Sequence, residues 1–214
     1  MGALRKSVTG LTGDTAGGAG PEGRPCELLA GADEAGRGAM AGPLVAAAVI
    51  LPAGEPPRGL RDSKLLTPRR REELYRVIER EALAWSWSCV SPAEVDSMGL
   101  QEANLAALRE AVLGLGLVPD LVLVDWFEIP GLGLPQRGLV KGDRLQPCIS
   151  AASVMAKVAR DRLMRHLDLL YPGYGFGRHK GYVTPEHLEA LRRLGPSALH
   201  RRSYAPVSQT RLEI

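Results

Sequence analysis

The amino-acid sequence predicts an α/β sandwich built on a mixed sheet. Three apolar, strand-like segments come early in the chain, at 28–32, 44–51 and 85–90, and helical and strand-like segments alternate after them. A chain of 214 residues with 45% hydrophobic residues is long and apolar enough to bury a substantial core. We therefore expect one layered domain that follows the N-terminal segment 1–25.

Local signals justify each element of this prediction. Segments 28–32 and 44–51 flank a Gly-rich stretch that suits a turn, so an antiparallel pair is plausible. A helix over 67–82 begins with Thr-Pro, an N-cap followed by proline at the first helical position. Ser91 opens a capping-box pattern. The elements expected after it are a helix over 100–113, strands over 121–124 and near 138–140, a long helix over 149–171 and a helix after Thr184.

Composition limits the classes of protein to consider. Residues 1–25 are rich in Gly and Thr and lack a continuous apolar region, so we expect a disordered tail. The longest apolar stretch, 40–51, is too short to span a bilayer, and no membrane segment is expected. Three cysteines without C-x-x-C spacing fit a reducing cytoplasm. A net charge of +3 is compatible with a polyanionic partner but does not require one.

Four acidic residues come after short apolar segments. Asp33 and Glu34 follow 28–32, while Asp125 and Asp143 end or follow the later predicted strands. Sites in open α/β sheets tend to lie beyond strand ends, and acids that converge there repel one another unless they are protonated or a cation neutralises them. Oxygen ligands without a His or Cys cluster favour Mg²⁺ or Mn²⁺. Each acid alone is more readily a helix cap or a solvated turn than a metal ligand, but their shared placement favours a metal site.

The segment Gly36-Arg37-Gly38 directly follows the first two acids. It has two readings. One is a flexible turn with a surface arginine, and the other is close approach of the backbone to a sugar-phosphate, which glycine permits because it has no side chain. The spacing alone leaves both open.

Longer motifs indicate a family. The run from Gly31 to Leu51 closely resembles the opening signature of ribonuclease HII, the bacterial type 2 ribonuclease H. Further motifs that look like blocks of that family follow in order, so that the resemblance covers about 28–207. They are Asp62–Lys64, Val122–Asp125, Lys141–Asp143, Ile149–Ser153, Ala156–Asp161, Tyr171–Phe176, His179–Tyr182 and His200–Pro206. Such a long ordered series is far more specific than any single motif.

The resemblance implies a ribonuclease H-like fold over 26–214, with a central mixed five-stranded sheet, flanking helices and a C-terminal helical extension. It also implies the catalytic and metal-binding carboxylates, which would be the four already singled out: Asp33, Glu34, Asp125 and Asp143. This sequence departs from the usual family pattern near one of them, because Trp126 stands where glycine is common.

The substrate contacts are likewise implied by the resemblance. Gly36, Arg37 and Gly38 would contact a ribose 2′-hydroxyl and the adjoining phosphate. Tyr182 would stack on the next deoxyribose, and Lys64 would approach a phosphate.

The implied activity is endonucleolytic. The enzyme would hydrolyse the RNA strand of RNA–DNA hybrids and cut on the 5′ side of ribonucleotides in duplex DNA, leaving 3′-hydroxyl and 5′-phosphate ends. Two Mg²⁺ or Mn²⁺ ions, about 4 Å apart, would activate water and stabilise the leaving oxygen. The 2′-hydroxyl would distinguish substrate from plain DNA. A cytoplasmic monomer that acts in ribonucleotide removal and primer clearance is expected.

Two other functions each fit part of the sequence. The pattern Gly36-x-Gly38-x-x-Ala41 matches the short dinucleotide-binding fingerprint of oxidoreductases, but Pro43 and the apolar run after it suit a strand where a helix should begin. A non-catalytic nucleic-acid-binding module would explain the basic balance. It would not explain the acids.

Overall fold

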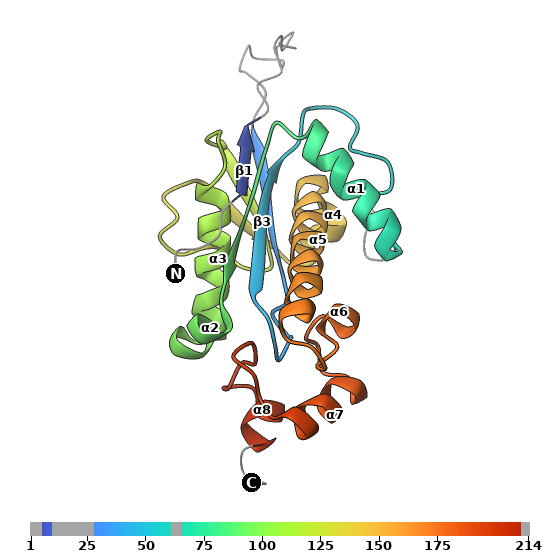
Figure 1. Ribbon diagram of the computed structural model, residues 1–214. Coiled ribbons are helices and arrows are strands. Elements are labelled where there is room, and N and C mark those ends of the chain that lie inside the picture. The colour runs from blue at the N-terminus through green and yellow to red at the C-terminus, as the bar shows by residue number, and fades with distance from the viewer. Residues whose placement is uncertain (1–5, 10–27, 61–65, 211–214) are drawn as a thin grey trace, which may run out of the picture.

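The computed structural model of the protein describes residues 6–9, 28–60 and 66–210 (Figure 1). Within these residues, six strands form one sheet in the order β1-β4-β3-β2-β5-β6. The strands are β1 Lys6–Thr9, β2 Leu29–Ala35, β3 Leu44–Ile50, β4 Ala84–Val90, β5 Leu121–Asp125 and β6 Gln136–Leu139. The first four are joined by antiparallel pairs, whereas β5 runs parallel to both β2 and β6. The predicted mixed sheet of five strands is therefore confirmed, with β1 added at its edge.

Helices cover both faces of this sheet. They are α1 Pro68–Glu81, α2 Pro92–Met98, α3 Leu100–Leu113, α4 Gly142–Leu145, α5 Pro147–Leu170, α6 Phe176–His179, α7 Pro185–Leu194 and α8 Ala205–Thr210. In Figure 1, α3 lies on one side of the sheet, α1 and α5 lie on the other, and α7 and α8 extend beyond one end. This arrangement confirms the expected layers and the C-terminal helical extension.

The strand β1 differs from the disordered tail expected over 1–25. Its four residues pair with β4, with Lys6 opposite Trp87 and Thr9 opposite Ala84. The physical reason is that β4 would otherwise present its outer backbone groups as an edge strand. Residues 1–5 and 10–27 lie outside the described part of the chain.

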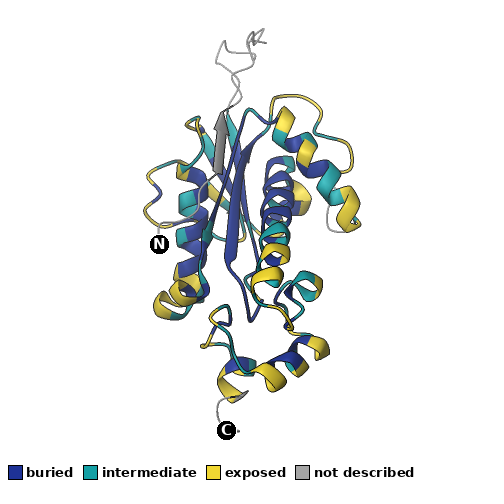
Figure 2. Ribbon diagram, viewed as in Figure 1, coloured by how far each residue is buried: buried dark blue, intermediate teal, exposed yellow. Residues whose placement is uncertain are grey.

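The core has two layers, one on each face of the sheet. Every residue of β3 is buried, as Figure 2 shows for this central strand. One layer packs β-sheet residues against α3, and the other packs them against α1 and α5, including Trp85 and Trp87 as expected for packing residues. Gly31 allows α5 to pack closely against β2, because a Cβ at this position would lie 2.1 Å from the backbone carbonyl carbon of Cys148. The start of α5 therefore lies directly against β2.

No helix in the described part of the chain is long and apolar enough to cross a membrane. The residues after Gly38 lead into β3 and not into a helix. The dinucleotide-binding alternative, which requires a helix at that point, is therefore wrong.

Candidate active site

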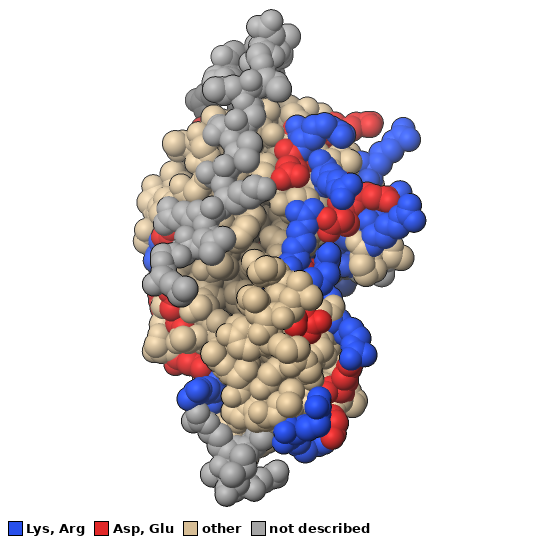
Figure 3. Space-filling view, viewed as in Figure 1, with Lys and Arg blue, Asp and Glu red and all other residues tan. Residues whose placement is uncertain are grey.

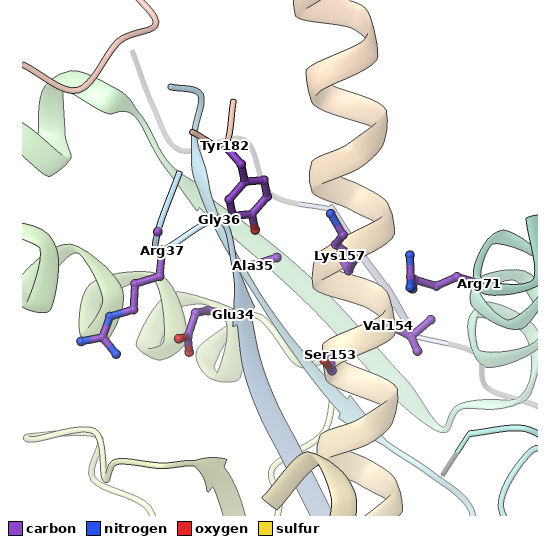
Figure 4. A pocket seen from close by; sticks show the side chains of 10 residues that line it. Glu34, Ala35, Gly36, Arg37, Arg71, Ser153, Val154, Lys157 and Tyr182 are labelled. Carbon is purple, nitrogen blue, oxygen red and sulfur yellow. The ribbon is translucent and has the colours of Figure 1, made fainter. Parts of the chain in front are cut away.

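Asp33 and Glu34 lie within β2, not after it as the sequence predicted. The apolar run ends at Ala32, but backbone pairing with β3 continues as far as Ala35. Successive side chains of a strand point to opposite faces of the sheet. Accordingly, Asp33 interacts with Ser153 of α5, and Glu34 interacts with Asn104 of α3. Figure 4 shows Glu34 and Ser153 on opposite sides of β2.

Asp125 and Asp143 are brought together by a backbone contact. Asp125 ends β5, the parallel neighbour of β2, and its Oδ1 accepts a hydrogen bond from the Gly142 N–H at 2.8 Å. Asp143 is the next residue, buried in the short helix α4. The sequence placed Asp143 directly after a strand, but Lys141 turns the chain with a left-handed backbone (φ 58°) and starts a helix there instead.

Burial and nearby negative charges make the carboxylates of Asp33 and Glu34 costly to ionise. Burial raises the pKa of Asp33 well above 3.8, and the charges of Glu34 and Asp125 raise it further, against hydrogen bonds from Ser153 and from the Glu34 N–H at 2.7 Å. Burial also raises the pKa of Glu34, with Asp125 adding to the effect and Arg37 and Asn104 opposing it. A cation beside these groups would favour their charged forms. Their donor set, oxygen only, fits a hard divalent ion.

The carboxylates are neighbours, but they do not converge on one point. Among the described residues, no group of three or more His, Cys, Asp or Glu side chains is arranged to hold a metal ion. The pleat of β2 directs Asp33 and Glu34 to opposite faces of the sheet. Metal binding by the four acids therefore stays a prediction.

Three polar residues that were not predicted from the sequence support the site, two at the acids and one at Arg37. Ser153 bonds Asp33, Asn104 contacts Glu34, and Gln101 accepts a hydrogen bond from Arg37 Nη2 at 2.8 Å. Asn104 is fully buried, and neither polar atom of its amide has a partner within strict hydrogen-bond geometry in the described structure. A sequence signal for Asn104 exists, because it interrupts the apolar stripe of α3.

The two glycines of the Gly-Arg-Gly motif have different surroundings. Gly36 has a φ of 90°, and a Cβ there would lie 1.9 Å from Arg160 Nε. Gly38 is exposed, and a Cβ there would meet nothing within 4 Å. Gly36 is thus required by the fold itself, whereas the backbone at Gly38 is open to approach from outside.

Two buried arginines hold the loop that carries this motif. Arg160 donates to the Pro43 carbonyl at 2.9 Å through Nε. Arg201 donates to the Gly42 carbonyl at 3.0 Å and to the Arg37 carbonyl at 3.0 Å. Because Arg160 lies on α5 and Arg201 lies between α7 and α8, the C-terminal extension and the sheet are joined at this loop.

A cavity of about 340 Å³ lies beside Glu34 (Figure 4). It brings together several predicted site residues from distant parts of the sequence, namely Glu34, Gly36, Arg37, Gly38 and Tyr182. Asp33, Asp125 and Asp143 do not line it. Lys64 lies outside the described residues.

The cavity also has three polar lining residues that were not predicted from the sequence. They are Ser153 and Lys157 of α5 and Arg71 of α1. Lys157 Nζ lies 5.5 Å from the centroid of the Tyr182 ring, so two cations and an aromatic ring face the same space.

Two histidines, His200 and His187, form consecutive hydrogen bonds that end at the Tyr182 carbonyl. The Ser197 N–H donates to His200 Nδ1 at 3.0 Å, so Nε2 of that ring carries the proton. His200 Nε2 lies 3.2 Å from His187 Nε2, which must therefore accept. His187 Nδ1–H then donates to the Tyr182 carbonyl at 2.9 Å. This sequence of bonds requires both rings to be neutral, and burial lowers the pKa of each to about 4.

This arrangement predicts how stability depends on pH. The unfolded chain takes up protons at these histidines near pH 6.5, while the folded chain resists protonation until about pH 4. The free energy of unfolding should therefore be highest above pH 6.5 and fall as the pH decreases towards 4. His187→Asn keeps a donor for the Tyr182 carbonyl but removes one titrating ring, so it should weaken this dependence. Denaturant titrations across the range measure it.

His166 provides the matched control, because it is exposed on α5. His166→Asn should keep the wild-type dependence on pH. If His187→Asn also keeps it, the histidines do not contribute stability in the way described.

Trp126 directly follows Asp125 at the end of β5. Its side chain is 54% exposed, its φ is 73°, and its ring contacts Phe127 edge-on with centroids 6.2 Å apart. The Arg37 guanidinium lies 5.5 Å from the centroid of the Phe127 ring. The backbone there adopts the left-handed conformation that favours glycine, which explains why tryptophan is an unusual residue at this position.

Comparisons with known proteins agree with this fold. The family model for ribonuclease HII matches residues 30–207. The chain is 51% identical over 181 residues to a ribonuclease HII of Desulfitobacterium hafniense, covering 85% of this chain and 70% of that protein. It is 52% identical over 185 residues to a ribonuclease HII of Thermus thermophilus, covering 86% of this chain and 90% of that protein.

A solved structure supports the same assignment. The crystal structure of the ribonuclease H2 from Pyrococcus horikoshii OT3 is 27% identical and superposes with a TM-score of 0.75, covering 86% of this chain and 97% of that one. Together, the fold and these matches define a nuclease with a ribonuclease H-like fold. The chain belongs to the ribonuclease HII family, and it is a metal-dependent endonuclease of the ribonuclease H type.

Proposed function

We propose that this enzyme hydrolyses the RNA strand of RNA–DNA hybrids and also cuts duplex DNA on the 5′ side of an embedded ribonucleotide. One observation carries the proposal: Glu34 on β2 lines a cavity together with the Gly-Arg-Gly loop and Tyr182, and two further acids lie beside it, Asp33 on β2 and Asp125 on the adjacent strand β5. Carboxylates suit phosphodiester chemistry with a metal ion, and an open backbone suits recognition of a sugar. Family membership supports the same reading.

Asp33, Glu34, Asp125 and Asp143 are the residues that would hold two divalent ions, Mg²⁺ or Mn²⁺. When bound, these ions would supply an activated water and charge stabilisation at the leaving oxygen, giving 3′-hydroxyl and 5′-phosphate ends. The chain's own contribution is to orient the acids. Ser153 bonds Asp33, and the Gly142 N–H bonds Asp125. Such supporting bonds fix the direction in which a carboxylate presents its lone pairs.

Substrate recognition would come from the cavity. The exposed backbone at Gly38 lets a ribose 2′-hydroxyl approach without meeting a side chain. The Tyr182 ring would stack on the neighbouring deoxyribose, and its carbonyl is held by His187. Lys157 and Arg71 add positive charge beside the phosphates. Lys64 would approach a further phosphate.

The biological setting follows from this activity. Removal of single ribonucleotides from DNA and clearance of RNA primers are the roles that such cleavage would serve in repair and replication. Action as a monomer is part of the proposal. A cytoplasmic location fits the absence of C-x-x-C spacing among the three cysteines.

A cleavage assay tests the proposal. A labelled RNA–DNA hybrid is incubated with the enzyme in Mg²⁺, in Mn²⁺ and in chelator. We expect cleavage of the RNA strand in either metal, none in chelator, and products that a ligase accepts because they carry 3′-hydroxyl and 5′-phosphate ends. Cleavage that persists in chelator, or products with 2′,3′-cyclic phosphate ends, would contradict the proposed chemistry.

A further inference from the structure

A basic groove runs beside the candidate active site. It has a volume of about 630 Å³ and is lined by seven Lys and Arg side chains but only two acids, Glu72 and Asp161. Its cations come from α1 (Arg69, Arg71 and Arg76), α5 (Lys157 and Arg165) and the segment around α6 (Arg178 and Lys180). Figure 3 shows Lys and Arg side chains gathered on the side of the molecule where α1 and α5 lie.

The basic groove continues from the cavity beside Glu34. Arg71 and Lys157 line both. A polyanion bound in the cavity therefore has a continuous positive surface along which to extend. A solvated face of a single helix would not produce this pattern, because here the positive charges come from three separate elements.

The acids in the groove neutralise only part of its charge, because two acids face seven cations. Glu72 pairs with Arg162, which lies outside the groove lining, and also with Arg165 at 3.8 Å, while Asp161 pairs with Lys157 at 2.7 Å. Arg76 is exposed and has no ion pair with any described residue. Burial lowers the pKa of Lys180, and the nearby charges of Arg165 and Lys157 lower it further, while Asp161 opposes this. The cations therefore repel one another in the free protein.

We propose that the basic groove binds the phosphodiester backbone of the duplex beyond the site of cleavage. This inference rests on the proposed function for its substrate, but it assigns a separate surface. Arg76 and Arg165 are exposed and lie over no aromatic ring of the described residues. Cations of this kind contact phosphates and do not read bases, so the binding is independent of sequence. Its role is to hold a long duplex while the Gly-Arg-Gly loop contacts the ribonucleotide.

The test uses a variant that changes only this surface. Arg76→Gln combined with Arg165→Gln removes two exposed charges from the basic groove and none from the cavity. Arg58→Gln combined with Arg192→Gln removes two exposed charges elsewhere and is the matched control. Binding to a fluorescent all-DNA duplex is measured by anisotropy at several salt concentrations, without divalent metal, so no strand is cut.

We expect the groove variant to bind more weakly and to lower the slope of log K against log salt by about 2, because each phosphate contact contributes about 0.9. The control should keep the wild-type slope. An unchanged slope in the groove variant, or an equal decrease in the control, would overturn the inference. Failure of the proposed function is distinguishable: the wild type would then fail to cut the hybrid, while the binding result would still report on the groove.

Discussion

Asp33→Asn is expected to reduce cleavage by at least about 10³-fold while leaving the fold as stable as the wild type or more stable. The loss in rate corresponds to about 4 kcal/mol of transition-state stabilisation, within the range that a metal ion supplies. The gain in stability follows from the raised pKa of Asp33, because the folded chain opposes its ionisation as the pH rises above 3.8. Asparagine has nearly the same shape without the charge.

Two measurements separate these effects. Single-turnover rates in Mg²⁺ give the loss of activity, and thermal denaturation at neutral pH gives the stability, whose gain should shrink as the pH falls towards 3.8. Added Mg²⁺ should raise the melting temperature of the wild type more than that of the variant. Asp168→Asn, on α5 and outside the cavity, should keep wild-type activity. An Asp33→Asn enzyme that cuts at the wild-type rate would contradict the assignment.

Gly36→Ala is expected to destabilise the protein by about 3 kcal/mol, the second large effect. Two causes add. Alanine is strained at a φ of 90°, and its Cβ would overlap the Arg160 side chain at 1.9 Å. Arg160 cannot move freely, because it is fully buried and bonded to the Pro43 carbonyl. Denaturant titration measures the change in the free energy of unfolding.

Gly38→Ala is the matched comparison within the same motif. Its Cβ meets nothing in the protein, so the free energy of unfolding should change by less than about 0.5 kcal/mol. The methyl group would instead obstruct the substrate, and KM for a hybrid should rise. Equal destabilisation by the two substitutions would mean that the motif has a single structural role.

The sequence predicted most of the fold because the relevant signals are local. Thr67 accepts from the Arg70 N–H as an N-cap, and Ser91 forms the complete capping box with Glu94. The strand β1 was missed because its pairing with β4 depends on an edge that is distant in sequence. No local pattern in the Gly- and Thr-rich N-terminal segment indicates that it pairs with β4.

The candidate site was predictable in its residue types but not in its geometry. The acids, the Gly-Arg-Gly motif and Tyr182 all belong to motifs that the sequence displays. The extension of β2 through Asp33 and Glu34 was not predictable, because backbone pairing with β3 continues beyond the last apolar residue of the run, Ala32. The structural requirement for glycine at position 36 depends on Arg160, which is 124 positions away and which no pattern in the sequence links to Gly36. Long-range packing of this kind leaves no local signal.

The most direct test of the proposed activity compares two labelled duplexes that differ by one 2′-hydroxyl, one all DNA and the other with a single ribonucleotide. Wild type and Asp33→Asn are incubated with each, in Mg²⁺ and in chelator. We predict one cut, 5′ to the ribonucleotide, made only by the wild type in Mg²⁺ and only in the duplex with the 2′-hydroxyl. Cleavage of both duplexes, or of neither by folded wild-type protein in Mg²⁺ or Mn²⁺, would contradict it.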